Sequence, residues 1–263
     1  MPALPVEANP NVSFAVLHED ERVAVVAKPP RMVSTPGVGH TTDTLLNGLI
    51  ARWGDRLSQL GASRSWGLLH RLDRETSGAL LVAFDVPAYA ALREQFESRQ
   101  MRKFYWAVVK GAPKNGKGVV RYPIAEQLRS SGKYTQVRTG RVASKTDRAG
   151  RPAVTAYRTL SVGVGASLVE CRAVTGRLHQ IRIHMDAIGC AVLGDDTYGP
   201  EMVRRASSRL ALHAHRIACQ HPDGGTLDVR TPWPKDLRNV LRRAELPRPD
   251  LKPEEQDDAD RAD

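Results

Sequence analysis

Asp73 lies between Arg71 and Arg74 in the stretch HRLDRETSG, residues 70–78, and apolar runs flank this stretch on both sides. Guanidinium groups nearby favour the ionised form of a carboxyl group. An ionised carboxylate can attack carbon and divide one difficult reaction into two steps. The spacing alone is more typical of a structural salt bridge at the start of a strand. Asp73 is therefore a candidate nucleophile that needs further support.

Other groups of reactive side chains lack a partner for the chemistry that they suggest. Asp73 and Glu75 could be the paired acids of a glycosidase, but the flanking arginines would neutralise them. His179 and His184 are five residues apart and do not share a helix face, and the HAH run at 213–215 offers two metal ligands without an obvious third. No GxxxxGKS/T loop, HExxH motif or GxSxG elbow occurs. We expect no metal site.

The charge of the chain indicates a polyanionic partner. Lys and Arg number 39 and Asp and Glu 29, a net charge of +10 over 263 residues. Residues 244–263 contain eight acids and three bases, which leaves +15 on residues 1–243. A body this basic usually binds nucleic acid. The acidic, proline-containing tail at 244–263 is predicted to be disordered.

The cysteines and the lack of long apolar runs indicate in which cell compartment the protein acts. Cys171, Cys190 and Cys219 are odd in number and far apart, which is typical of buried thiols in a reducing cytoplasm. No run approaches the roughly 18 apolar residues of a membrane span. Residues 1–12, an N-terminal extension, lack the features of a secretory signal. We expect a cytoplasmic monomer that does not contact a membrane.

Residues 128–151 form a basic arm. Only one acid, Asp147, accompanies seven basic residues, with glycines and serines between them. The segment is either a solvated insertion or an arm that contacts phosphates, and the density of like charge favours the arm. We predict an exposed loop or hairpin. The basic residues are Arg129, Lys133, Arg138, Arg141, Lys145, Arg148 and Arg151.

Hydrophobic periodicity predicts the elements that hold these residues. Helices are expected within residues 41–54, 86–100, 178–189 and 233–244. The pattern shows no regular βαβ rhythm, so we predict an α+β fold around a largely antiparallel mixed sheet. Strands are expected within residues 13–30 (a pair joined at 19–21), 78–84, 103–111, 168–174, 209–219 and 225–231.

The helix expected from residue 178 has two faces. Its apolar stripe ends at Gly189, as a helix that stops at glycine would. His179, Arg182 and Asp186 share a neighbouring polar face. The stripe consists of Leu178, Ile181, Met185 and Ile188.

The stretch at residues 70–78 resembles the HRLDxxTSG signature of the RluA-type pseudouridine synthases. The resemblance extends over residues 14–234 and implies a pseudouridine synthase fold, with flanking helices and loops around a central RNA-binding cleft. It implies a catalytic domain at 13–243, without an S4-type module in front. Four further blocks, one before and three after this stretch, resemble blocks of the family and stand in its order. They are VVAKPPRMVSTPG at 25–37, KFYWAVVKG at 103–111, TGRLHQIRIHMDAIGCAVLGDDTYG at 175–199 and LALHAHRI at 210–217.

The resemblance also implies roles for matching residues. Asp73 would be the catalytic aspartate and Arg182 its ion-pair partner. Tyr105 would stack on the target uracil and help to remove the proton from C5. Arg71 would fill the space that the flipped uridine leaves. Further candidates for base flipping or RNA binding are His70, Arg74, Arg177, His179, Gln180, Lys28 and Lys103.

The implied reaction needs no metal, nucleotide or redox cofactor, and the expected partner is rRNA or tRNA. Two departures from the family pattern stand out: Leu178 replaces Thr or Ser, and Pro30-Arg31 replaces a small residue and Gly. Alternative hypotheses are an inactive RNA-binding protein or chaperone of the same fold, and a basic structural protein of the ribosome. A nucleoside-bond glycosidase is the third, and it would release free base.

Overall fold

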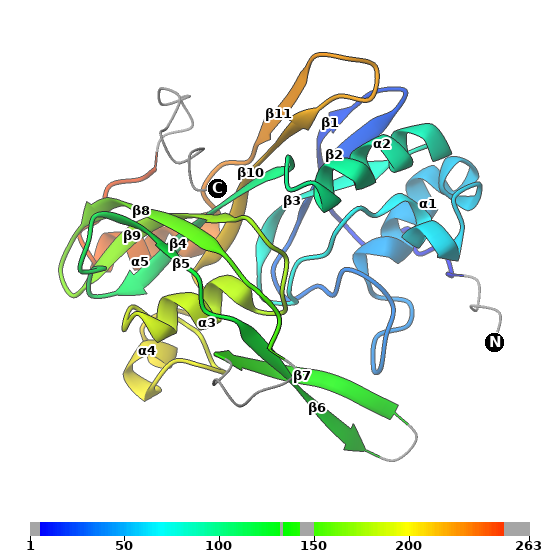
Figure 1. Ribbon diagram of the computed structural model, residues 1–263. Coiled ribbons are helices and arrows are strands. Elements are labelled where there is room, and N and C mark those ends of the chain that lie inside the picture. Colours follow the sequence, from blue (N-terminus) through cyan, green and yellow to red (C-terminus); the bar gives the residue numbers. More distant parts are fainter. Residues whose placement is uncertain (1–5, 132–133, 143–149, 250–263) are drawn as a thin grey trace. The chain divides into compact units, whose positions relative to one another are not determined.

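The computed structural model describes residues 6–131, 134–142 and 150–249 of the chain. The chain divides into two compact units (Figure 1). The first consists of Met1–Lys103 and Ala214–Thr231, and the second of Phe104–His213 and Pro232–Asp263.

The first unit is built on a sheet whose strands run in the order β1-β2-β3-β10, and β11 pairs with β10. The pairs β1–β2, β2–β3 and β10–β11 are antiparallel. β2 and β3 are buried along almost their whole length, because both faces of the sheet are covered there. The strands are β1 (Ala15–Glu19), β2 (Val23–Lys28), β3 (Ser77–Ala83), β10 (Leu212–Gln220) and β11 (Thr226–Arg230).

Two helices complete the first unit, α1 (Leu45–Ser58) and α2 (Val86–Glu97), with a 3₁₀ segment, η1 (Ala62–Gly67). The first helix begins with a capping box in which Asn47 Oδ1 accepts from the backbone N–H of Thr44 at 3.1 Å. The second is capped by Asp85, whose side chain accepts from the N–H of Ala88 at 2.8 Å. The predicted helices at 41–54 and 86–100 are thus confirmed.

The second unit contains an antiparallel sheet in the order β4-β9-β8-β5. Most of β4 (Arg102–Lys110) and all of β5 (Lys117–Val120), β8 (Thr155–Val162) and β9 (Ala166–Ala173) belong to it. Its helical segments are α3 (Gln180–Ala187), α4 (Glu201–Arg205), η2 (Lys235–Leu237) and α5 (Arg238–Arg243). The predicted α+β fold with antiparallel strand pairing is confirmed.

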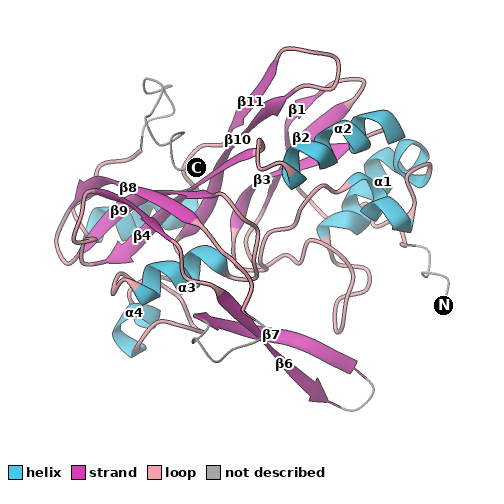
Figure 2. Ribbon diagram, viewed as in Figure 1, coloured by secondary structure: helices cyan, strands magenta, loops and turns pink. Residues whose placement is uncertain are grey.

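A hairpin in the second unit forms a two-stranded sheet of its own (Figure 2). Its strands, β6 (Ile124–Ser131) and β7 (Tyr134–Val142), pair antiparallel, and β7 lies against α3. This backbone confirms a hairpin within the predicted basic arm at 128–151. Residues 132–133 and 143–149 of that arm lie outside the described residues.

The helix that carries Arg182 begins later than predicted. It starts at Gln180, and His179 precedes it with a φ of +52°, in the left-handed region. His179 therefore does not lie on the helix face of Arg182 and Asp186, and the predicted apolar stripe loses its first residue. The end of the helix agrees with the prediction, because Gly189 follows the C-cap with a φ of +80°.

The segments near both predicted domain boundaries are packed. Asn47 Nδ2 donates to the carbonyl of Glu7 at 2.7 Å, and a Cβ at Gly48 would lie 2.9 Å from Val12. Ala244 and Leu246 are buried, so the packed chain continues past residue 243. Residues 250–263 of the predicted acidic tail lie outside the described residues.

Two sequence predictions about the whole chain concern cysteines and membranes. The three cysteines are buried and free, as predicted. Among the helices that the structure describes, none has the length and the apolar character needed to cross a membrane.

Candidate active site

Asp73 lies on a tight loop that leads into β3. Before the loop, the N–H of Leu69 donates to the carbonyl of Leu81 at 3.4 Å, and at its end the N–H of Thr76 donates to the carbonyl of Asp73 at 3.1 Å. Asp73 itself is half-buried. We call residues 70–76 the Asp73 loop.

A glycine allows the loop to enter the sheet. Gly78 has a φ of +126°, and a Cβ at this position would lie 2.2 Å from the carbonyl oxygen of Ala214. Any other residue would push β3 away from β10. The glycine of the signature is therefore required by strand packing.

Ser34 holds the residue before Asp73. Its Oγ donates to the carbonyl of Leu72 at 2.9 Å and accepts from the N–H of Leu72 at 3.2 Å. Both residues are buried, so no water competes for these bonds. The backbone on the N-terminal side of Asp73 is fixed by this contact.

Lys28 holds the residue after Asp73. Its Nζ donates to the carbonyls of Pro29 and Met32, both at 2.8 Å, and to that of Arg74 at 3.2 Å. The side chain is only 1% exposed, and a buried ammonium needs such acceptors. Lys28, which the resemblance suggested as an RNA-binding residue, is instead directed into the protein and supports the Asp73 loop.

His70 joins the loop to β3 as a neutral acceptor. Its Nε2 accepts from the N–H of Leu81 at 3.3 Å, and its ring centroid lies 5.3 Å from that of Phe96. Desolvation by burial, with the nearby charge of Lys103, lowers the pKa of His70 to about 3. Lys103 Nζ lies 5.0 Å above the Phe96 ring, and burial lowers the pKa of Lys103 to about 8.

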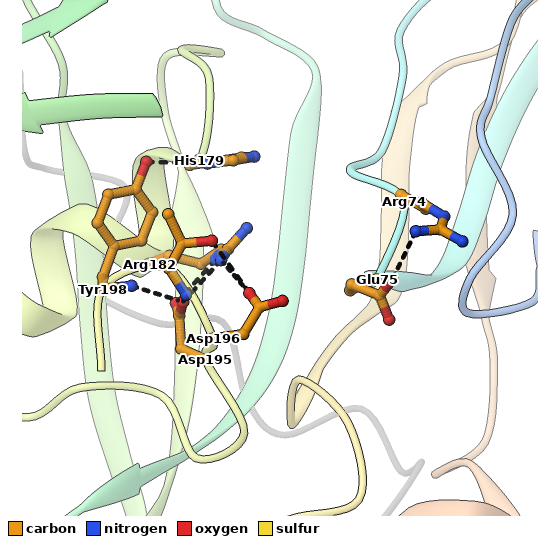
Figure 3. Close-up of polar contacts among 8 residues, drawn as sticks. Arg74, Glu75, His179, Arg182, Asp195, Asp196 and Tyr198 are labelled. Carbon is orange, nitrogen blue, oxygen red and sulfur yellow. Dashed lines mark hydrogen bonds and ion pairs between the residues drawn. The ribbon is translucent and has the colours of Figure 1, made fainter. Parts of the chain in front are cut away.

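The arginines of the loop point outward. Arg71 and Arg74 are exposed, and Arg74 Nη1 lies 3.9 Å from Glu75 Oε1 (Figure 3). An ion pair at this separation on the surface contributes little to stability. These side chains are positioned to meet a ligand in solvent.

Arg182 of the second unit makes a two-pronged ion pair. Its Nε donates to Asp195 Oδ2 at 2.8 Å, and its Nη2 donates to Asp195 Oδ1 at 2.6 Å (Figure 3). The two side chains are 4% and 1% exposed. Desolvation would raise the pKa of Asp195, but the hydrogen bonds and charge of Arg182, with backbone N–H donors, hold it below its ordinary value.

Two further side chains contact Arg182, and a third contacts one of these two. Asp196 Oδ1 lies 3.5 Å from Nη2, and the guanidinium carbon lies 5.1 Å from the centroid of the Tyr198 ring. Tyr198 Oη lies 2.9 Å from His179 Nδ1 (Figure 3). We call Arg182, Asp195, Tyr198 and His179 the arginine centre.

Gln180 uses its amide within the protein. Its Nε2 donates to the carbonyl of Val154 and to Thr155 Oγ1, both at 2.9 Å. Its Oε1 accepts from Thr175 Oγ1 at 2.6 Å and from the N–H of Arg177 at 3.1 Å. Gln180, another suggested RNA-binding residue, is therefore buried and holds the turn before α3.

The remaining predicted residues lie in the second unit. Arg177 is half-buried, and its Nε donates to the carbonyl of Pro152 at 3.0 Å. Tyr105 is 9% exposed on β4, where it pairs with Cys171 of β9. The suggested pair of Asp73 and Arg182 joins residues of different units and stays a prediction.

Some residues of the site were not recognised in the sequence. Ser34 and Asp195 act on partners that are 38 and 13 residues away, and a linear pattern does not reveal such contacts. Asp195 and Tyr198 do stand in the LGDDTYG block of the resemblance, which was the available signal. Among the described residues, no group of three or more His, Cys, Asp or Glu side chains could hold a metal ion.

Comparison with known proteins identifies the class. The family model described as RNA pseudouridylate synthase matches residues 22–187. The chain belongs to this family, whose members are isomerases of uridine in RNA. The predicted family, enzyme class and fold are thereby confirmed.

Curated bacterial relatives match most of the chain. It is 37% identical over 240 residues to the "Ribosomal large subunit pseudouridine synthase D" of Zymomonas mobilis, covering 88% of this chain and 73% of the relative. It is 35% identical over 240 residues to the "Uncharacterized RNA pseudouridine synthase YlyB" of Bacillus subtilis, covering 91% of this chain and 75% of the relative.

Two solved human structures share the fold. "Human RNA Pseudouridylate Synthase Domain Containing 4" superposes with a TM-score of 0.67 at 26% identity, covering 90% of this chain and 95% of that one. "Human RNA Pseudouridylate Synthase Domain Containing 1" gives a TM-score of 0.65 at 23% identity, covering 91% and 98%.

Proposed function

We propose that this protein converts uridine to pseudouridine in RNA and that Asp73 is the nucleophile. The observation that carries the proposal is the Asp73 loop: the residues on both sides of Asp73 are fixed by the buried side chains of Ser34 and Lys28. A catalytic group must be held within a fraction of an ångström of its working position, and this loop meets that need.

The reaction moves one bond within a nucleotide. The N1–C1′ glycosidic bond of uridine breaks, the uracil turns, and a C5–C1′ bond forms to the same ribose. C5 loses its proton to solvent and N1 gains one, so no atom is added overall. Asp73 would form and release the covalent intermediate.

The other site residues take supporting roles in this proposal. Arg182 would pair with Asp73 and orient its carboxylate. Tyr105 stacks on the flipped uracil and assists the loss of the C5 proton. Arg71, which is exposed on the loop, enters the gap in the RNA stack.

We propose rRNA of the large subunit as the first substrate to test, because the Zymomonas mobilis relative is named for it. Transfer RNA is the second. The net charge of +10 supports a polyanionic substrate. The basic arm at 128–151, the exposed Arg74 and the half-buried Arg177 would contact phosphates. The catalytic domain would span residues 13–243. It would act as a monomer in the cytoplasm, where its free cysteines would stay reduced.

The test is release of tritium from RNA that carries C5-labelled uridine, with large-subunit rRNA and bulk tRNA assayed separately. Wild type should release tritium, and Asp73→Asn should abolish release. Glu75→Gln, a carboxylate change two residues away in the same loop, should leave it intact. Free uracil in the product would indicate a glycosidase. RNA binding without release by the wild type would favour an inactive RNA-binding protein.

A further inference from the structure

We infer that Asp195 is a positioning residue for the isomerisation, because it fixes the orientation of the Arg182 guanidinium that serves Asp73. This inference rests on the proposed function. Asp195 would not touch the RNA: it is 1% exposed and acts through Arg182.

The fork between the two side chains sets the plane of the guanidinium. Asp195 binds the edge formed by Nε and Nη2 through both of its oxygens, at 2.8 and 2.6 Å. Two parallel hydrogen bonds to a planar group remove its freedom to rotate about the end of the side chain. The edge formed by the two Nη atoms then has a fixed direction. In the proposed reaction this edge would bind the carboxylate of Asp73.

Asp195 is itself held in place by backbone. Its Oδ1 also accepts from the N–H groups of Thr197 and Tyr198, both at 3.0 Å. The turn made by these bonds brings the Tyr198 ring to 5.1 Å from the guanidinium carbon, where a cation–π contact is favourable. Arg182 is thus held along one edge by Asp195 and across one face by Tyr198 (Figure 3).

Asp196 does not carry the same role. It lies 3.5 Å from Nη2 through a single contact, and its side chain is 77% exposed. Solvent weakens an ion pair of this kind. The adjacent acid therefore offers a comparison within the site: its removal should leave Arg182 in place.

A second fork in the same unit provides a control with the same bonding pattern and a more exposed carboxylate. Arg209 is 2% exposed and donates to Asp236, which is 48% exposed, through Nε and Nη2, at 2.6 and 3.0 Å. This fork joins the start of β10 to η2, and neither residue is part of the proposed catalytic machinery. A change at Asp236 tests what the loss of such a fork does to stability alone.

The experiment compares Asp195→Asn with Asp236→Asn in the full chain, by kcat and KM for tritium release and by thermal unfolding. Loss of a residue that orients a directly acting group typically costs about 10–100-fold in activity. We expect Asp195→Asn to lower kcat on this scale with KM changed by less than about threefold, because the orientation matters in the transition state. Asp236→Asn should keep the wild-type kcat while Tm falls.

Asp195→Glu keeps the charge and moves the carboxylate by one methylene group. It should recover part of the kcat lost in Asp195→Asn. If Asp195→Asn does not fold, Asp195→Glu decides the question: a kcat below that of wild type at unchanged KM supports the inference, and a wild-type kcat overturns it.

Three results would contradict the inference. A wild-type kcat in Asp195→Asn would show that Arg182 needs no orientation by Asp195. A loss confined to KM would assign Asp195 to RNA binding. An equal loss of kcat in Asp195→Asn and Asp236→Asn, in step with Tm, would make both forks structural. A wild type that releases no tritium would overturn the proposed function first, so the two failures are distinguishable.

Discussion

The Asp73 loop and the arginine centre are rigid for different reasons. In the loop, Ser34 and Lys28 hold the backbone on either side of the carboxylate, and the side chains of the loop's arginines are exposed. In the arginine centre two hydrogen bonds to Asp195 hold the charged side chain of Arg182 itself. The proposed nucleophile, which would form and break a covalent bond, is held by its backbone, whereas Arg182, which would only supply charge, is held through its own side-chain atoms.

The two arrangements differ in energy as well. A buried carbonyl that loses its donor costs about 1–3 kcal/mol. Removing one partner of a buried ion pair costs about 3–5 kcal/mol, because the remaining charge has no compensation. The arginine centre should therefore be the more sensitive region to a change of one residue.

The largest effect is expected for Arg182→Met. This change leaves the Asp195 carboxylate buried without its fork, and the free energy of unfolding should fall by about 3–5 kcal/mol. Arg74→Met on the Asp73 loop removes an exposed charge and should cost about 0–1 kcal/mol. Urea denaturation of both variants measures the difference. Equal losses would mean that the buried fork does not dominate the stability of its region.

A smaller loss is expected for Lys28→Met. The side chain keeps most of its length, but three carbonyls lose their common donor, so the free energy of unfolding should fall by about 1–3 kcal/mol. Activity should fall too, since a shift of about 1 Å in a reacting group can cost about 100-fold in rate. Lys110→Met, at the exposed end of β4, is the control and should stay within about 0.5 kcal/mol of wild type. A stable Lys28→Met with full activity would contradict this account of the loop.

Much of the fold could be predicted from local patterns. The apolar runs predicted β2 and β3, and the spacing of apolar residues, with the capping residues, predicted α1 and α2. β8 was not recognised, because most of its residues are half-buried and its polar and apolar side chains do not alternate clearly. β5 has four residues, one of them glycine, which is too short for a period.

The candidate site was predictable only where one stretch of sequence carries it. Asp73 stands in a compact motif, so it was recognised. The start of α3 was misjudged because Leu178 continues the apolar period, although the left-handed backbone of His179 prevents the helix from starting before Gln180. The suggested RNA-binding roles of Lys28 and Gln180 followed from their place in the blocks that resemble the family, and a sequence motif does not show which side chains are buried.

A pH-dependent effect distinguishes the neutral His70 from the charged groups. Its pKa is lowered to about 3, so between about pH 6.5 and 3 the unfolded chain binds a proton that the folded chain does not. The stability of the fold should therefore fall as pH decreases through this window. His70→Gln should remove about 1–2 kcal/mol of the decrease between pH 7 and pH 5.

The measurement for His70 is the free energy of unfolding at several pH values. Lys103→Met should remove less of the decrease, because burial is the first cause of the lowered pKa and the charge of Lys103 the second. A His70→Gln variant with the pH dependence of wild type would mean that His70 is not desolvated in the folded protein.

The smallest effect is expected in the turn after β2, where the Asp73 loop receives its support. Arg31 stands where the family pattern has glycine, and its φ is +62°, in the left-handed region. The left-handed conformation destabilises a residue that has a Cβ by about 1–2 kcal/mol. Glycine avoids this strain, but its larger entropy in the unfolded chain offsets up to about 1 kcal/mol of the gain. Arg31→Gly should therefore be more stable than Arg31→Ala by about 0.5–1 kcal/mol, since both variants lose the same contacts and differ only in the backbone strain. Urea denaturation of the pair measures this difference, and an Arg31→Ala at least as stable as Arg31→Gly would show that the turn relaxes away from the left-handed conformation.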